Sequence, residues 1–112
     1  PPASGYLQWI QASIGERLEF IATSEVLFFQ AADKYTRVVR ASGEALIRKP
    51  IYELVGELDP EQFWQIHRSS LVNVKAIQDV TRDIRGHLMI RLKGIDERVE
   101  VSRSYSHRFK QM

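Results

Sequence analysis

Short apolar segments rich in β-branched and aromatic residues recur along the chain between residues 18 and 101. Turn-forming residues separate them, and none approaches the roughly 20 apolar residues that span a membrane as a helix. This pattern predicts strands over residues 18–22, 25–32, 35–41, 44–49, 76–83, 87–93 and 97–101. In the segment 87–93, Leu88, Ile90 and Leu92 occupy alternate positions, as expected of a strand with one buried face. The chain is therefore expected to be mainly β.

Three short helices are expected beside these strands. The run from Pro50 to Leu58 has apolar residues at helical spacing after a proline suited to a first helical position. The pair Asp59-Pro60 predicts the start of a second helix that carries Phe63 and Trp64. A third helix is expected after Ser102, whose side chain can cap its first turn.

The N-terminal residues differ from the rest of the chain. Prolines and glycines flank Leu7, Ile10 and Ile14, which would share one face of a helix. We interpret residues 1–15 as a short helix or linker from an upstream domain, and residues 16–112 as a single domain.

The residue content excludes several classes of functional site. The 112 residues include no Cys, so a disulfide scaffold and a thiolate zinc site are excluded. The three histidines, His67, His87 and His107, lie far apart, and none has a second ligand type at metal spacing. Ser69 and Ser70 follow His67, but no Gly-x-Ser-x-Gly elbow and no glycine-rich phosphate loop accompany them. We therefore expect no enzyme, no metal and no other cofactor.

Three polar clusters lie at strand ends or in turns, where side chains can project without disturbing the core. They are Asp33-Lys34-Tyr35-Thr36-Arg37, His67-Arg68-Ser69-Ser70 and Ser102-Arg103-Ser104-Tyr105. Residues 1–33 hold one basic and four acidic residues, whereas residues 34–112 hold fifteen basic and ten acidic ones. Arg is the best donor to guanine edges, and Lys, Ser and Thr contact phosphates. Each cluster alone is most simply a solvated turn or a helix cap, but together they favour a surface that binds nucleic acid.

The second cluster lies within a longer motif. The run FWQIHRSSLVNVKAI (63–77) resembles the signature of LytTR-type DNA-binding domains, roughly F-x-R-x-H-R-S-x-(apolar)-V-N-x-x-x-I. Three further segments resemble that family in order and spacing, namely VLFFQAADKYTRVV, KPIYELVGELDPEQF and VEVSRSYSHRFK. The resemblance covers about residues 18–110.

The resemblance implies an elongated β-β-β sandwich that binds duplex DNA through loops rather than through a recognition helix. It also implies the cytoplasmic output domain of a bacterial two-component response regulator, with a receiver domain upstream and no membrane association. A dimer on repeated DNA sites is compatible with this role. Transferred to this chain, the base-contacting residues are Thr36, Arg68 and Arg103. The backbone-contacting residues are Lys34, Tyr35, Arg37, Ser69, Ser104 and Lys75.

Individual positions refine this assignment. Gln65 stands where the family commonly has a basic residue, which leaves one phosphate contact unassigned. Thr36 is short and suits a phosphate or a thymine methyl better than a polar base edge. We expect Asn73 to satisfy backbone groups in a turn, His67 to orient its loop and Tyr105 to lie partly in the core.

Two other functions stay open on the sequence. A β-rich protein-interaction module could use the same basic loops to bind an acidic partner. An RNA-binding domain would instead stack unpaired bases on exposed aromatic rings. Salt dependence and competition between duplexes separate these functions from sequence-specific DNA binding.

Overall fold

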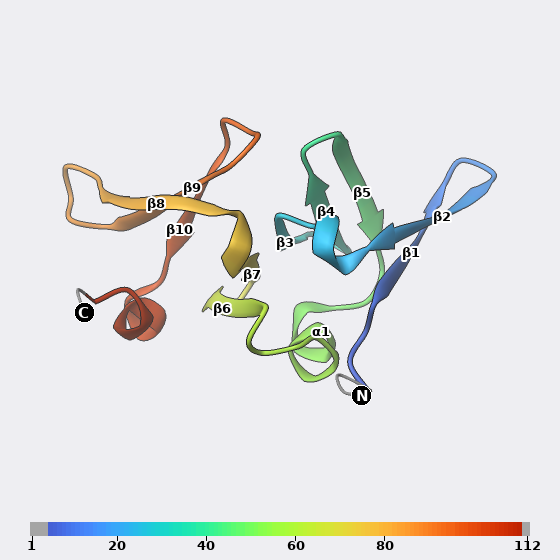
Figure 1. Ribbon diagram of the computed structural model, residues 1–112, viewed down its shortest axis with the longest axis horizontal. Helices are drawn as coiled ribbons and strands as arrows, with labels where there is room; N and C mark the ends of the chain where they lie inside the picture. The colour runs from blue at the N-terminus through green and yellow to red at the C-terminus, as the bar shows by residue number, and fades with distance from the viewer. Residues whose placement is uncertain (1–4, 111–112) are drawn as a thin grey trace.

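A five-stranded antiparallel sheet forms the centre of the computed structural model, which describes residues 5–110. Its strand order is β5-β4-β3-β7-β6, and a smaller sheet lies on each side of it (Figure 1). The central strands are β3 (Phe28–Ala32), β4 (Tyr35–Arg40), β5 (Gly43–Ile47), β6 (Phe63–His67) and β7 (Ser70–Asn73).

Different elements cover the two faces of the central sheet. The hairpin of β1 (Trp9–Ile14) and β2 (Arg17–Ala22) and the helix α1 (Ile51–Glu57) pack on one face. The other face packs against the three-stranded sheet of β8 (Ile77–Arg82), β9 (Leu88–Leu92) and β10 (Arg98–Val101). Three short 3-10 helices also lie within residues 5–110: η1 (Thr23–Glu25), η2 (Val74–Ala76) and η3 (Arg103–Arg108).

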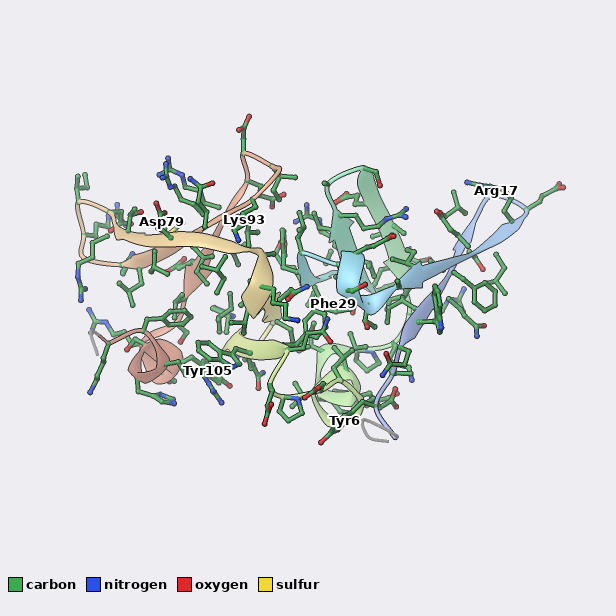
Figure 2. All side chains as sticks on the ribbon, viewed as in Figure 1. Tyr6, Arg17, Phe29, Asp79, Lys93 and Tyr105 are labelled. Atoms are coloured by element: carbon green, nitrogen blue, oxygen red, sulfur yellow. The ribbon has the colours of Figure 1, made fainter. Side chains whose placement is uncertain are left out.

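Burial on both faces explains the unbroken apolar runs of the central strands. Phe29 and Leu71 point into the core beneath α1 and the β1–β2 hairpin. Their neighbours Phe28 and Val72 point into the second core beneath β8–β10. All four side chains are at most 2% exposed, and Figure 2 shows Phe29 in the middle of the molecule. The apolar run that follows the second polar cluster is therefore a strand shared by two cores.

Both edge strands of the central sheet have neighbours. β1 lies beside β5 at one edge. At the other edge, the backbone amide of Ser102 donates to the carbonyl of Ile66 in β6 at 2.8 Å. An ion pair between Arg40 and Glu19, at 3.1 Å, also joins β4 to the β1–β2 hairpin.

The structure confirms the mainly β class, and its principal extents of 44 × 33 × 24 Å agree with the elongated sandwich expected from the resemblance. The helix expected from Pro50 to Leu58 is present as α1. No helix within residues 5–110 is long and apolar enough to cross a membrane.

The expected N-terminal helix is wrong for residues 9–14, which form β1. Ile10, Ala12 and Ile14 occupy alternate positions and face the core, and β1 pairs with β2 along its whole length, from Ile14 opposite Arg17 to Trp9 opposite Ala22. Residues 1–4 of the expected linker lie outside the described residues, and their origin in an upstream domain stays a prediction.

The second expected helix is also wrong, because Phe63 and Trp64 begin β6. Asp59 accepts a hydrogen bond from the backbone amide of Glu61 at 2.9 Å, as a helix cap would. This hydrogen bond stabilises a turn but no helix follows it, because the Phe63 side chain packs in the first core. Its ring centroid lies 5.4 Å from that of Phe29.

Candidate nucleic-acid interface

The turn between β6 and β7 presents Arg68 to solvent, because Arg68 and Ser69 alone connect the two strands. Nδ1 of His67 accepts a hydrogen bond from the backbone amide of Ser69 at 3.2 Å and lies 2.9 Å from its hydroxyl. An amide can only donate, so this nitrogen is an acceptor and the hydroxyl donates to it as well. His67 thus orients the turn, and the Arg68 side chain has no partner among residues 5–110.

The turn between β3 and β4 lies at the same end of the central strands as the Arg68 turn. The two turns therefore share the edge of the sheet that these strand ends form. The turn between β3 and β4 consists of Asp33 and Lys34, and Asp33 adopts a φ of 59°, in the left-handed region that Asp tolerates. The backbone amide of Ala31, near this turn, donates to the carbonyl of Ser69 at 2.8 Å. Lys34 and the adjacent Tyr35 are exposed beside the Arg68 turn.

The start of η3 lies on the other side of the Arg68 turn. The bond between the Ser102 amide and the Ile66 carbonyl holds this segment against the end of β6. The Ser102 hydroxyl accepts from the amide of Ser104 at 3.4 Å, so it caps η3 as expected. Arg103 and Ser104 are exposed just after the cap. The three sequence clusters therefore adjoin one another along one edge.

Aromatic packing fixes η3 on β6. The rings of Trp64 and Phe109 meet edge to face with centroids 5.7 Å apart. The guanidinium of Arg108 lies 5.2 Å from the centre of the Trp64 ring. Tyr105 packs partly buried against the second core, as expected from the sequence. Arg103 is thus held by a short helix that is itself anchored to the strand leading to Arg68.

Thr36 does not reach the surface. Its side chain is 2% exposed, and its hydroxyl donates to the carbonyl of Lys49 at 2.8 Å. Strand alternation turns Thr36 toward the first core, on the same face as Val38. The expected base contact is incompatible with this burial.

Arg37 is engaged within the protein. Its guanidinium donates to Glu97 in two bonds of 3.0 and 2.9 Å, to Glu44 at 2.8 Å and to Gln30 at 2.6 Å. It also lies 5.6 Å from the centre of the Phe28 ring. Hydrogen bonding to Glu97 raises the pKa of Arg37 above its ordinary value, against the opposing effect of burial. Arg37 links the central sheet to the β8–β10 sheet, so the expected phosphate contact does not fit its position.

Lys75 is exposed but lies away from the three turns. β7 starts at the Arg68 turn and runs to Asn73, so Lys75, in η2, follows the opposite end of that strand. Asn73 is buried, donates to the carbonyl of Val26 at 2.9 Å and accepts from the amide of Lys75 at 3.0 Å. The structural role expected for Asn73 is confirmed.

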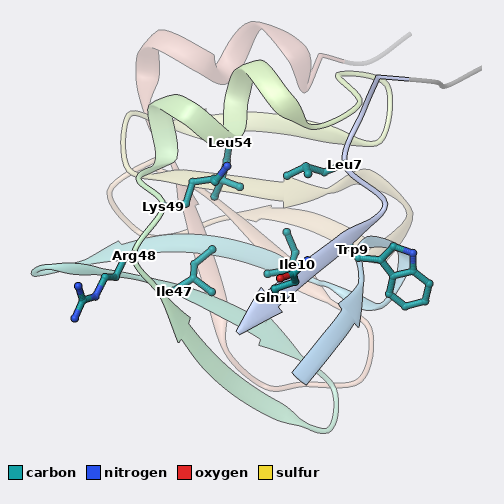
Figure 3. A pocket seen from close by; sticks show the side chains of 8 residues that line it. All are labelled: Leu7, Trp9, Ile10, Gln11, Ile47, Arg48, Lys49 and Leu54. Atoms are coloured by element: carbon teal, nitrogen blue, oxygen red, sulfur yellow. The ribbon is translucent and has the colours of Figure 1, made fainter. Parts of the chain in front are cut away.

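Arg48 is a basic residue at this edge that the sequence motifs did not indicate. It follows β5, next to the position paired with Thr36, and it lines a shallow hollow together with Tyr35. A second hollow of about 320 Å³, between β1, β5 and α1, has a mainly apolar lining, and Figure 3 shows Arg48 pointing away from it. Only the sheet register brings Arg48 beside Tyr35, which lies thirteen residues earlier in the sequence.

The edge is therefore basic and free of internal ion pairs. Among residues 5–110, the side chains of Lys34, Arg48, Arg68 and Arg103 form no salt bridge and no hydrogen bond with another residue. The same part of the chain has no group of three or more His, Asp or Glu residues placed to hold a metal ion. Unpaired guanidinium groups on rigid turns suit the recognition of phosphates and of guanine edges.

Known proteins share both this sequence pattern and this fold. The pattern of the LytTr DNA-binding domain family matches residues 16–112. The solved LytTr DNA-binding domain of a response regulator from Bacillus cereus matches with a TM-score of 0.83 at 25% identity. That match covers 92% of this chain and 94% of the Bacillus cereus chain.

Longer relatives carry a similar segment. An uncharacterized response regulatory protein of Vibrio cholerae is 42% identical over 109 residues, which are 94% of this chain and 41% of the relative. The positive alginate biosynthesis regulatory protein of Pseudomonas aeruginosa is 38% identical over 109 residues, or 94% of this chain and 44% of that protein. The CO-responsive transcriptional regulator RcoM of Rhodospirillum rubrum is 31% identical over 104 residues, or 93% and 44%. The chain thus spans about two-fifths of the length of these relatives.

The β scaffold and the matching sequence pattern define a domain of the DNA-binding regulatory class. The chain belongs to the LytTr DNA-binding domain family, which confirms the resemblance drawn from its motifs.

Proposed function

We propose that this domain binds duplex DNA in a sequence-specific manner, as the output domain of a bacterial transcriptional response regulator. The observation that carries the proposal is that three turns adjoin one another at one edge of the central sheet. Arg68 and Arg103 lie on adjoining segments there, and both side chains are exposed and unpaired among residues 5–110.

Arg68 and Arg103 are the proposed base readers. A guanidinium can donate two parallel hydrogen bonds to O6 and N7 of guanine, and one such contact discriminates by about 1–3 kcal/mol. Both arginines stand on short segments fixed by backbone hydrogen bonds and by buried neighbours. Such support limits the conformational entropy lost when the side chain binds a base.

Lys34, Tyr35, Arg48, Ser69 and Ser104 are the proposed contacts to the DNA backbone. Phosphate contacts fix the register of a protein on the duplex without reading sequence. The molecule is 44 Å long, and one turn of the duplex is about 34 Å. The molecule as a whole can therefore extend along more than one turn of the duplex. We propose that Arg68 and Arg103 read successive major grooves, with bending of the DNA bringing both within reach.

The relatives suggest the cellular setting of this activity. Proteins named as a response regulatory protein and as a transcriptional regulator contain a similar segment as about two-fifths of their length. We accordingly propose a phosphorylated receiver domain upstream, action in the cytoplasm, and binding of two copies to repeated DNA sites.

Selection of bound duplexes from a random pool tests the proposal. We expect a consensus sequence, binding that weakens with salt, and retention of that duplex against bulk competitor DNA. Recovery of no consensus would contradict the proposal and favour a protein-interaction module. Preference for unpaired RNA over every duplex would favour RNA binding instead.

A further inference from the structure

A basic hollow lies on the β8–β10 side of the molecule, beyond the Arg103 turn. It has a volume of about 360 Å³ and lies between the end of β8, the start of β9, the end of β10 and η3. Arg82, Arg103 and Lys110 supply three cationic side chains around it, and Leu88, Val101 and Phe109 supply an apolar lining.

Most of the positive charge at the hollow is available to a ligand. The side chains of Arg103 and Lys110 have no hydrogen-bonding or ion-pair partner among the described residues. One nitrogen of Arg82 donates to the carbonyl of Gly86 at 3.0 Å, which holds the guanidinium at the hollow and leaves its other N–H groups free.

Two carboxylates, those of Asp83 and Glu100, lie near the hollow through His87, which is one of its lining residues. Asp83 accepts hydrogen bonds from the backbone amides of Arg85 and His87, each at 2.9 Å. The second oxygen of Asp83 and an oxygen of Glu100 lie 3.5 and 3.8 Å from Nδ1 of His87. Asp83 and Glu100 are not among the residues that line the hollow, whose charged lining side chains are Arg82, Arg103 and Lys110.

A sugar–phosphate backbone matches this lining. Its phosphates carry the negative charge, and the deoxyribose rings between them present C–H surface that packs on apolar side chains. Arg103 belongs both to the hollow and to the edge where the three turns meet. Arg103, Lys110 and Arg82 line the same hollow, so a DNA strand that continues from Arg103 into it would meet the other two cations.

We infer that the basic hollow binds the phosphodiester backbone of the duplex beyond the outermost base that Arg103 reads. This inference rests on the proposed function and extends it, because it makes the β8–β10 sheet part of the DNA-binding surface. Arg82 and Lys110 are contacts that add affinity and salt dependence without adding sequence preference.

The salt dependence of binding tests the hollow directly. With a duplex obtained by selection, log Kd is measured against log salt concentration for wild type, Arg82→Gln, Lys110→Gln and the double variant. Each lost phosphate contact should lower the magnitude of the slope by about 0.9, and the preference over scrambled duplex should persist. Arg17→Gln is the matched control, because Arg17 lies at the tip of the β1–β2 hairpin, at the other end of the molecule (Figure 2).

Shortening the duplex provides a second, independent measurement. Base pairs are removed one by one from the end of the duplex that faces the hollow. Once the phosphates that contact the hollow are removed, the affinity of the wild type should fall, whereas the affinity of the double variant should stay the same. Suppose that the wild type selects a duplex but the double variant has the same slope of log Kd against log salt concentration and loses as much affinity as the wild type on shortening. The hollow then does not contact DNA. Failure of wild type to select any duplex would instead contradict the proposed function. Circular dichroism and urea unfolding confirm that each variant is folded, and Lys110→Gln removes no contact described within the protein.

Discussion

Arginines that look alike in the sequence have different roles in the structure. The side chains of Arg68 and Arg103 have no partner among residues 5–110, whereas the guanidinium of Arg37 donates hydrogen bonds to three other side chains. The sequence places Arg37 three residues after Lys34, which made it resemble a phosphate contact. Its partner Glu97 lies sixty residues away, and no local pattern reveals that pair. The burial of Thr36 was not predicted for a related reason. Alternating side chains show that a strand has two faces, but they do not show that other elements cover both of them.

Replacing Arg68 tests direct reading of a base. Arg68→Ala should lose about 1–3 kcal/mol of preference for the selected duplex and relax selection at a single position of the site. The measurement is competition between cognate and scrambled duplex, with Arg17→Ala as a control for the loss of one positive charge. Equal discrimination by Arg68→Ala and wild type would exclude Arg68 as a reader.

Arg37 should act on stability rather than on DNA. Arg37→Ala leaves Glu97, Glu44 and Gln30 without their shared donor, and we expect a loss of about 1–3 kcal/mol in the free energy of unfolding. Urea unfolding measures this loss. In DNA titrations under conditions where the variant is folded, the slope of log Kd against log salt concentration should equal that of the wild type. Unchanged stability with a slope reduced by about 0.9 would instead support the phosphate contact that the sequence indicated.

The acceptor on His67 can be tested with a matched pair of variants. His67→Ala removes the acceptor for the Ser69 amide, so the turn loses its fixed orientation and DNA affinity should fall. The side chain of Asn can accept from the amide two residues later, as in an Asx turn, so His67→Asn should bind more tightly than His67→Ala. Equal dissociation constants for the two variants would show that this hydrogen bond does not matter for binding.

Among the secondary-structure elements, β1 shows why some predictions succeeded and others failed. Leu7, Ile10 and Ile14 fit a helical period, but Ile10, Ala12 and Ile14 fit a strand period equally well. The partner strand β2 decides between them, and pairing with β2 is a tertiary property that a local period does not contain. Strands flanked by clear turns, such as β4 and β9, were predictable because their period had no competing interpretation.

β7 joins the two cores, and Asn73 ends it with hydrogen bonds on both sides of its amide. Asn73→Ala leaves the buried carbonyl of Val26 and the amide of Lys75 without these partners. We expect a loss of about 1–3 kcal/mol in the free energy of unfolding, measured in urea. Gln78→Ala, an exposed change on β8, is the control. A change for Asn73→Ala as small as that of the control would contradict the structural role of this side chain.

The whole molecule has two cores that share one sheet, so we expect it to unfold as a single cooperative unit. Leu54→Ala opens a cavity in the first core and Ile90→Ala opens one in the second. Each should cost about 2–5 kcal/mol and shift the same transition. Coincident curves from tryptophan fluorescence and circular dichroism verify this expectation. Two separated transitions in either variant would show that the cores unfold independently.

The covered edges of the central sheet have a consequence for crowding on DNA. An open edge strand is a template for pairing with another chain, and proteins held at adjacent sites experience a high local concentration of each other. Here β1 flanks one edge and the segment around Ser102 flanks the other. If neighbouring copies occupy repeated DNA sites as proposed, the central sheet of one copy is therefore not open to strand pairing with that of the next.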